Sequence, residues 1–300
     1  MTTPYADRLD ARTRELGNPC LVGLDPHFEL LPEEFAVARD PEAPRAERAR
    51  AVESFLLQIV ELAAGRVPAV KPQSAFFERL GADGAVAWER VVAAARAAGL
   101  LVIGDVKRSD IASTARAYGQ AYLEDAGDAC CDAITVNPYL GADSIEPLLE
   151  VCERTGGGLY VLVRTSNPGS AMFQHHGEPP LVHVVAREVA RWGSELRGES
   201  GLSSVGAVVG ATHSDQIAKL RTLMPHTPFL IPGYGAQGAG AEETRAGFLG
   251  EGRGALVNSS RGILYAWRKP ENEGKHWKDA SLAAIESMVE EFRALFAKTS

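Results

Sequence analysis

Three charged side chains stand close together in one segment of the chain, residues 101–111. The segment is apolar at first and then places Asp105, Lys107 and Asp110 immediately before a helical pattern. Successive side chains of a strand point to opposite faces, so we expect Asp105 and Lys107 to share one face while Val106 points to the other. Carboxylates on either side of a lysine keep it cationic. Such a lysine can donate a proton or stabilise negative charge, so this segment is our candidate for an active site.

The same residues also have a purely structural interpretation. Asp105 and Lys107 could form an ordinary salt bridge at a strand end, and Asp110 could be the N-cap of a helix through Ala121, a position that favours Asp. The segment alone does not decide between the two, because a short motif is a hypothesis until its context is known. That context comes from the elements around it.

Short apolar runs that could be strands alternate with longer helical patterns along the chain. We count eight such runs, at residues 20–24, 67–70, 100–104, 133–136, 159–163, 205–209, 229–231 and 255–257. The helical candidates between them include residues 45–64, 84–98, 111–127, 181–196, 214–223 and 280–297. Alternation predicts a parallel sheet, and eight units in 300 residues predict a closed (β/α)₈ barrel, or TIM barrel, as one domain over residues 1–300. An open doubly wound sheet is the alternative.

Polar residues follow nearly every predicted strand, at the end where barrel enzymes carry their reactive groups. Two long segments, at about residues 26–50 and 167–180, also follow predicted strands, so we expect them to be loops or lids on that catalytic face. Together these residues predict a polar mouth on an apolar wall. The strand-end residues are Asp25, Lys71, Asp105, Lys107, Asn137, residues 164–167, Pro232 and Asn258.

The loops after the last two predicted strands favour a phosphate site. Barrels commonly bind phosphate between these two loops, and here one is rich in glycine (Gly233, Gly235 and Gly238) while the other contains Arg261 and Gly262. Glycine lets backbone N–H groups approach a phosphate, and a guanidinium can bind it with two hydrogen bonds. The alternative is that the glycines only make tight turns and that Arg261 pairs with a surface carboxylate.

Composition restricts the class of protein. A net charge of −8 argues against a nucleic-acid partner. The four cysteines, Cys20, Cys130, Cys131 and Cys152, have neither metal-site spacing nor a disulfide pattern, and the histidines are not spaced as metal ligands. No run of about 18 apolar residues occurs, which predicts no membrane span. We therefore expect a soluble cytoplasmic protein with reduced thiols and no metal.

Several motifs, taken in order, resemble the orotidine 5′-phosphate decarboxylase family, specifically its longer type 2 bacterial branch, over nearly the whole chain. The motifs are LDP (24–26), VKP (70–72), the Asp105/Lys107/Asp110 signature, TVNPY (135–139), RTSNPG (164–169), IPGYGAQ (231–237) and NSSRGI (258–263). The resemblance implies a barrel homodimer that converts orotidine 5′-monophosphate (OMP) to uridine 5′-monophosphate (UMP) and carbon dioxide in pyrimidine biosynthesis. It also implies that the reaction needs neither a metal nor an organic cofactor.

The resemblance assigns a role to individual residues. Lys107 would be the proton donor, flanked by Asp105 and Asp110, and Lys71 would complete the charged chain. Asp110 would come from the neighbouring subunit together with Thr114, so the active sites would be shared. The residues implied in substrate binding are Asp25 and Lys71 at the ribose hydroxyls, Ser166 at the pyrimidine edge, Gln237, Arg261 and Gly262 at the phosphate, and Asn137 and Pro232 without an assigned part of the substrate.

Three other functions fit parts of the pattern. A metal-dependent phosphosugar decarboxylase on a related barrel would use a similar pattern of acids and lysine. A Schiff-base aldolase would need Lys107 or Lys71 to become neutral, which adjacent carboxylates oppose. A non-catalytic sensor of phosphorylated ligands would use the phosphate loops and leave Lys107 without a role.

Overall fold

The eight predicted strands form a closed parallel barrel in a computed structural model that describes residues 2–210, 214–235 and 240–297. Each strand pairs with the next along the chain, and β1 also pairs with β8, so the barrel is closed and the open-sheet alternative is wrong. The strands are β1 (Cys20–Leu24), β2 (Ala69–Pro72), β3 (Leu101–Arg108), β4 (Ala133–Val136), β5 (Gly158–Arg164), β6 (Val205–Val209), β7 (Phe229–Pro232) and β8 (Ala255–Ser259).

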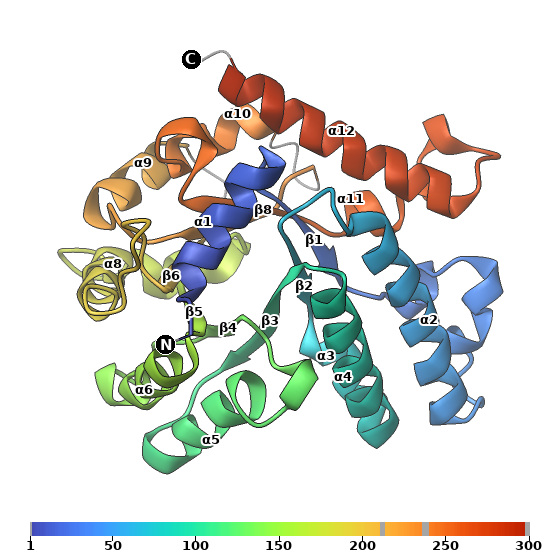
Figure 1. The fold of residues 1–300 in the computed structure, drawn as a ribbon, viewed down its shortest axis with the longest axis horizontal. Helices are drawn as coiled ribbons and strands as arrows, with labels where there is room; N and C mark the ends of the chain where they lie inside the picture. The colour runs from blue at the N-terminus through green and yellow to red at the C-terminus, as the bar shows by residue number, and fades with distance from the viewer. Residues whose placement is uncertain (1, 211–213, 236–239, 298–300) are drawn as a thin grey trace.

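Helices surround the barrel on its outside (Figure 1). The longer ones are α1 (Tyr5–Leu16), α2 (Arg45–Ala63), α4 (Gly81–Ala97), α5 (Ala112–Leu123), α6 (Glu146–Thr155), α8 (Leu181–Trp192), α9 (Ser214–Leu223) and α12 (Trp277–Ala297). The shorter ones are α3 (Ser74–Glu78), α7 (Ala171–Gln174), α10 (Ala241–Thr244) and α11 (Arg261–Leu264). None of the helices in the described residues is both long and apolar enough to cross a membrane.

Strand side chains that alternate in direction divide the core in two. One buried cluster joins β-strand residues that point into the barrel, and a larger cluster joins the outward strand residues to the helices. The inward set ends in polar residues toward the carboxyl ends of the strands, because Lys71 follows Ala69 and Asp105 follows Ile103 at a spacing of two. The inward cluster contains Leu21, Ala69, Leu101, Ile103, Ala133, Tyr160, Val208, Leu230 and Leu256.

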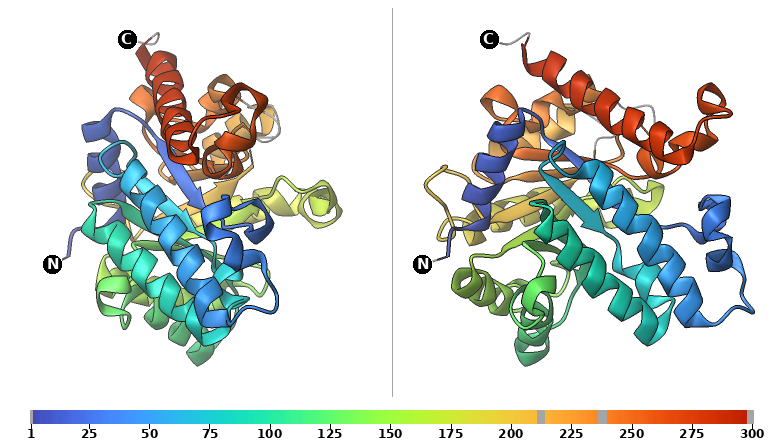
Figure 2. Two further views of the ribbon diagram at one scale, coloured as in Figure 1. Left: turned by 90° about the vertical axis from the view of Figure 1, so that its right-hand side faces the viewer. Right: turned by 45° about the vertical axis from the view of Figure 1, so that its right-hand side comes forward.

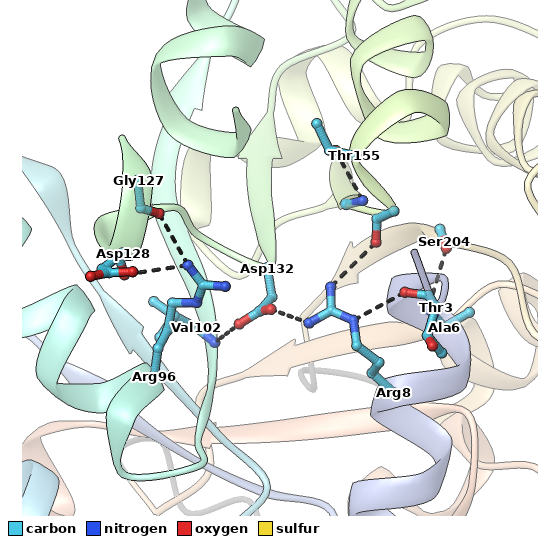
Figure 3. A network of polar contacts seen from close by, with 12 residues as sticks. Thr3, Ala6, Arg8, Arg96, Val102, Gly127, Asp128, Asp132, Thr155 and Ser204 are labelled. Atoms are coloured by element: carbon cyan, nitrogen blue, oxygen red, sulfur yellow. Dashed lines mark hydrogen bonds and ion pairs between the residues drawn. The ribbon is translucent and has the colours of Figure 1, made fainter. Parts of the chain in front are cut away.

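Helix α1 closes the opposite, amino-terminal end of the barrel. Its Tyr5 is fully buried and its hydroxyl lies 2.9 Å from that of Tyr160 inside the barrel. Figure 3 shows Arg8 of α1 reaching Asp132, which precedes β4 and also accepts a 2.8 Å hydrogen bond from the Val102 backbone N–H. Because α1 covers that end, the carboxyl ends of the strands are left as the mouth of the barrel.

Several strands extend further than the sequence predicts. The predicted runs at 67–70 and 100–104 are β2 (Ala69–Pro72) and β3 (Leu101–Arg108), so Lys71, Asp105 and Lys107 lie within strands. The prediction ended each run at the first polar residue, whereas the strand continues because polar side chains there face the mouth instead of the apolar interior. Helix α5 begins at Ala112, with Ile111 as its N-cap, so Asp110 is not the N-cap.

The two long segments carry short helical turns. After β1 come the 3₁₀ helices η1 (Phe28–Leu30) and η2 (Glu33–Arg39), and after β5 come η5 (Pro168–Ser170) and α7. Figure 2 shows the yellow-green segment that follows β5 projecting from the body of the molecule. The four cysteines are free, and Cys20, Cys131 and Cys152 are buried, as expected for reduced core thiols.

Candidate active site

Asp105 lies between two lysines at the mouth of the barrel. Its Oδ2 accepts a 2.5 Å hydrogen bond from Nζ of Lys71 on β2, and its Oδ1 accepts one of 2.5 Å from Nζ of Lys107. Lys71 is only 5% exposed and Asp105 7%, whereas the Lys107 side chain is 47% exposed. The outer ammonium is therefore accessible to a substrate while the inner ion pair supports it.

The electrostatics keep the inner groups of this cluster ionised. Burial alone would raise the pKa of the Asp105 carboxyl, but the charges of Lys71 and Lys107 outweigh it and hold that pKa well below its usual range. Burial also disfavours the charged form of Lys71, yet Asp105 and Asp25 together raise its pKa above the ordinary value. At neutral pH the buried pair is a carboxylate and an ammonium.

A break in strand register lies where Asp105 and Lys107 meet. Gly104 pairs with Ile134 and Arg108 with Val136, so three residues of β3 lie opposite the single residue Thr135 of β4. Lys107 adopts a left-handed φ of 44°, a backbone conformation that residues other than glycine rarely adopt. The predicted arrangement is confirmed, since Asp105 and Lys107 share one face while Val106 packs in the outer cluster, and the bulge adds a local bend of the backbone at Lys107.

Thr135 is a residue of the site that the sequence analysis quoted only as part of a motif. Its Oγ1 donates a 2.9 Å hydrogen bond to Asp105 Oδ1 and accepts one of 3.0 Å from the Lys107 backbone N–H. No signal in the sequence marks this role, because it depends on the register break between β3 and β4.

Unpartnered oxygens lie beside the cluster, at the ends of β1 and β8. Asp25 Oδ1, Asn258 Oδ1 and Ser260 Oγ are buried and have no hydrogen-bond partner among the described residues. Gly23 makes room for this group, since a Cβ there would lie 2.8 Å from both Asn258 Oδ1 and Ser260 Cβ. Buried acceptors without partners are costly, so these groups are suited to a ligand rich in hydroxyl or amide donors. Asp25 is the predicted ribose contact among them.

Asp110 and Thr114 do not contact the Lys71–Asp105–Lys107 cluster of their own chain in the hydrogen bonds and ion pairs of the described residues. Asp110 accepts a 2.8 Å hydrogen bond from the Ile111 backbone N–H, and its carboxylate has no ion pair within the described residues. Thr114 is exposed on the first turn of α5. Among the described residues of one chain, the Lys107 ammonium pairs with Asp105 and not with Asp110, and the proposal that Asp110 flanks it requires a second chain.

Two of the predicted substrate-binding residues, Ser166 for the pyrimidine edge and Asn137, lie after β5 and β4. Asn137 follows β4, where its Oδ1 accepts a 3.0 Å hydrogen bond from the Tyr139 backbone N–H and shapes the turn. Ser166 is half-buried just beyond β5, close enough to Gly210 that a Cβ there would lie 3.1 Å from the Ser166 N. Ser166 thus stands at the mouth, while the Asn137 oxygen already has a backbone partner.

The predicted phosphate residues and Pro232 come from the ends of β7 and β8. Pro232 ends β7, and Gly233 and Gly235 after it adopt φ values of 103° and 74°, which favour glycine. Arg261 and Gly262 begin α11, and the exposed Arg261 guanidinium makes no hydrogen bond or ion pair with the described residues. Gln237 and Gly238 lie outside the described residues.

A hydroxyl of the core fixes the backbone on the β1 side of the mouth. The Tyr265 hydroxyl accepts a 2.7 Å hydrogen bond from the His27 backbone N–H and donates one of 2.9 Å to the Asp25 carbonyl.

In the described parts of the chain, no group of three or more His, Cys, Asp or Glu side chains is placed to hold a metal ion. The chemistry that this mouth offers is that of fixed positive charge and one accessible ammonium.

Comparison with known proteins agrees with this geometry. The family model described as "Orotidine 5'-phosphate decarboxylase / HUMPS family" matches residues 21–276. An orotidine 5′-phosphate decarboxylase of Rhodopirellula baltica is 42% identical over 96% of this chain and 99% of its own, and one of Clostridium novyi is 38% identical over 95% and 97%.

Solved structures agree over the same length. A crystal structure from Streptomyces avermitilis has a TM-score of 0.81 and 36% identity, covering 99% of this chain and 97% of its own. The structure of Leishmania donovani OMP decarboxylase has a TM-score of 0.77 and 30% identity, covering 98% and 99%. Sequence motifs, barrel and charged cluster lead to one conclusion: the chain belongs to the orotidine 5′-phosphate decarboxylase family.

Proposed function

We propose that this chain decarboxylates OMP to UMP and carbon dioxide in pyrimidine biosynthesis, with Lys107 as the proton donor. The observation that carries the proposal is the Lys71–Asp105–Lys107 cluster, in which a buried ion pair supports a half-exposed ammonium at the mouth of a barrel. We infer the substrate from the family to which the chain belongs. The charged cluster explains how this site could act on that substrate.

The reaction requires stabilisation of a carbanion. When the bond from carbon 6 of the pyrimidine to the carboxylate breaks, the electron pair remains on carbon 6 and cannot delocalise easily into the ring. Preorganised positive charge beside that carbon lowers the barrier because it needs no reorganisation during the reaction. The Lys107 ammonium then transfers a proton to carbon 6, which completes UMP, and solvent restores the lysine proton.

Binding energy from the distant phosphate can assist the chemistry. A phosphate held by Arg261, Gln237 and the Gly262 backbone would anchor the nucleotide while Asp25 and Lys71 hold the ribose and Ser166 contacts the base. Interactions remote from the reacting carbon can position the ring and favour loop closure over it. The exposed guanidinium of Arg261, without a partner in the described chain, supports this assignment.

Replacing Arg261 with alanine tests the phosphate site. A charged hydrogen bond contributes about 1.5 to 3 kcal/mol, so the variant should bind UMP roughly 10- to 100-fold more weakly. Titration calorimetry with UMP and with uridine measures this, since uridine lacks the phosphate and its affinity should not change. Arg268→Ala, which removes an exposed arginine on the same segment, is the control. Unchanged UMP affinity in Arg261→Ala would exclude this residue from the phosphate site.

We also propose a homodimer in which each site takes Asp110 and Thr114 from the partner. Thr114 is exposed, as are the apolar side chains of Ile111, next to Asp110, and of Tyr139 and Leu140, which follow β4, the strand paired with β3. Clustered exposed apolar residues are typical of protein contact surfaces. A two-fold pairing through these residues would cover them and could direct the unpaired Asp110 carboxylate to the partner's charged cluster.

Mixed subunits test the shared site. Asp110→Ala and Lys71→Ala should each be inactive alone, but a heterodimer of the two has one complete site. Random mixing should therefore restore about a quarter of wild-type activity. Mixing Lys71→Ala with Lys107→Ala is the control, because both residues belong to the same chain's site and no complete site can form. Absence of recovery in the first mixture, with heterodimers shown by native mass spectrometry, would contradict the shared site.

A metal-dependent phosphosugar decarboxylase is the alternative that the assay must separate. The purified protein is given OMP in chelator and, separately, a phosphorylated keto sugar acid with Mg²⁺, and carbon dioxide is measured in both. We expect release from OMP alone. Release only from the sugar acid, and only with Mg²⁺, would favour the alternative.

We further propose a cytoplasmic location, with which the free thiols agree.

A further inference from the structure

Thr135 occupies a position from which it can align two groups of the charged cluster at once. Its side chain lies directly opposite the register break in β3, where residues 105 to 107 face this one residue of β4. The residue is 1% exposed, and both hydrogen bonds of its hydroxyl go to protein groups. It therefore has no surface with which to contact a substrate.

The hydroxyl has the donor and acceptors that this position needs. A threonine hydroxyl donates one hydrogen and accepts through its lone pairs. Here the hydrogen goes to Asp105 Oδ1 at 2.9 Å, and a lone pair receives the Lys107 backbone N–H at 3.0 Å. The same Asp105 oxygen accepts the Lys107 ammonium at 2.5 Å, so backbone, hydroxyl, carboxylate and ammonium form a closed ring.

The ring holds a backbone conformation that β3 would not adopt unaided. Lys107 has φ of 44°, and its N–H lies at the bulge, where strand pairing is interrupted. Without the Thr135 hydroxyl, the Lys107 amide at the bulge would lose its hydrogen-bond partner, and the backbone that carries the ammonium would no longer be fixed relative to Asp105. Strained residues of this kind persist only when their surroundings fix them.

We propose that Thr135 is a positioning residue that sets the direction of the Lys107 ammonium through its hydroxyl. This role rests on the proposed function, because it concerns the proton donor of that reaction. Removal of the hydroxyl should leave substrate binding intact, because phosphate, ribose and base contacts lie on other residues. It should slow the chemical step, because a misplacement of about 1 Å between reacting groups can cost roughly 100-fold in rate.

The test compares Thr135→Val, which keeps the shape and removes the hydroxyl, with Thr135→Ser, which keeps the hydroxyl. Steady-state turnover of OMP and calorimetric affinity for UMP are measured for both. For Thr135→Val we expect kcat to fall about 10- to 100-fold, with KM and UMP affinity within about threefold of wild type. Thr135→Ser should stay within about threefold of wild type in all three. Thr13→Val, at a buried threonine of α1, controls for loss of a hydroxyl elsewhere.

Each outcome decides the matter. Wild-type kcat in folded Thr135→Val, equal losses in the Val and Ser variants, or a loss confined to KM and UMP affinity would overturn the positioning role. If Thr135→Val does not fold, Thr135→Ala is judged by the same criteria. A wild-type protein that leaves OMP unchanged would refute the proposed function instead, so the two failures are distinguishable.

Discussion

Replacing Lys107 with alanine is expected to lower kcat for OMP by about 10⁴-fold or more, since the substitution removes both the proton donor and the nearest positive charge. The protein should still fold. The lysine side chain is 47% exposed, and alanine retains the Cβ, so the left-handed backbone at this position becomes no more strained. Initial rates from the absorbance of OMP, together with a thermal melt, measure the two effects separately.

Lys219→Ala is the matched control for this substitution. Lys219 is an exposed lysine of α9, and its removal should leave turnover and melting temperature unchanged. Turnover of folded Lys107→Ala within tenfold of wild type would remove Lys107 from the mechanism and would leave the charged cluster with a structural role alone.

Replacing Asp105 with asparagine is expected to impair both activity and stability. Lys71 is 5% exposed and relies on the Asp105 carboxylate at 2.5 Å. Breaking a buried ion pair by removing one partner costs about 3 to 5 kcal/mol, because the remaining charge is left uncompensated. Lys107 loses its only ion pair among the described residues, so kcat should fall by at least about 100-fold through misplacement of the ammonium. Chemical denaturation and steady-state kinetics measure these losses.

Glu78→Gln supplies the comparison for Asp105→Asn. Glu78 is a half-exposed carboxylate that pairs with Arg108, the last residue of the same strand. Exposed ion pairs contribute about 0 to 1 kcal/mol, so this variant should remain close to wild type in stability. If both variants lost stability equally, the effect would belong to β3 in general and would not reflect a buried charge in the cluster.

The barrel could be predicted from the sequence because each strand and helix has its own local pattern. The strands β1, β4 and β6 and the helix α9 match the predicted ranges residue for residue. Strand ends were less predictable, since Lys71 and Asp105 are polar yet belong to strands. Helix α1 was not predicted: half of its residues are charged, and its stability depends on contacts such as Tyr5 with Tyr160 that join distant parts of the chain.

The charged cluster could be predicted in part. The spacing of Asp105 and Lys107 indicated that they act together, and the motif at Lys71 placed a second lysine at the same mouth. The bulge at these residues depends on how β3 pairs with β4, which no local pattern encodes. Thr135 was missed for that reason. The proposed role of Asp110 rests on contacts with a second chain, which the local pattern of one chain does not encode.

The most direct test of the central claim is the ultraviolet absorbance of OMP after addition of the purified, chelator-treated protein. We predict a continuous loss of OMP absorbance, with UMP and carbon dioxide formed in equal amounts, and no dependence on added metal. OMP that remains unchanged in the presence of folded, dimeric protein would contradict the decarboxylase function.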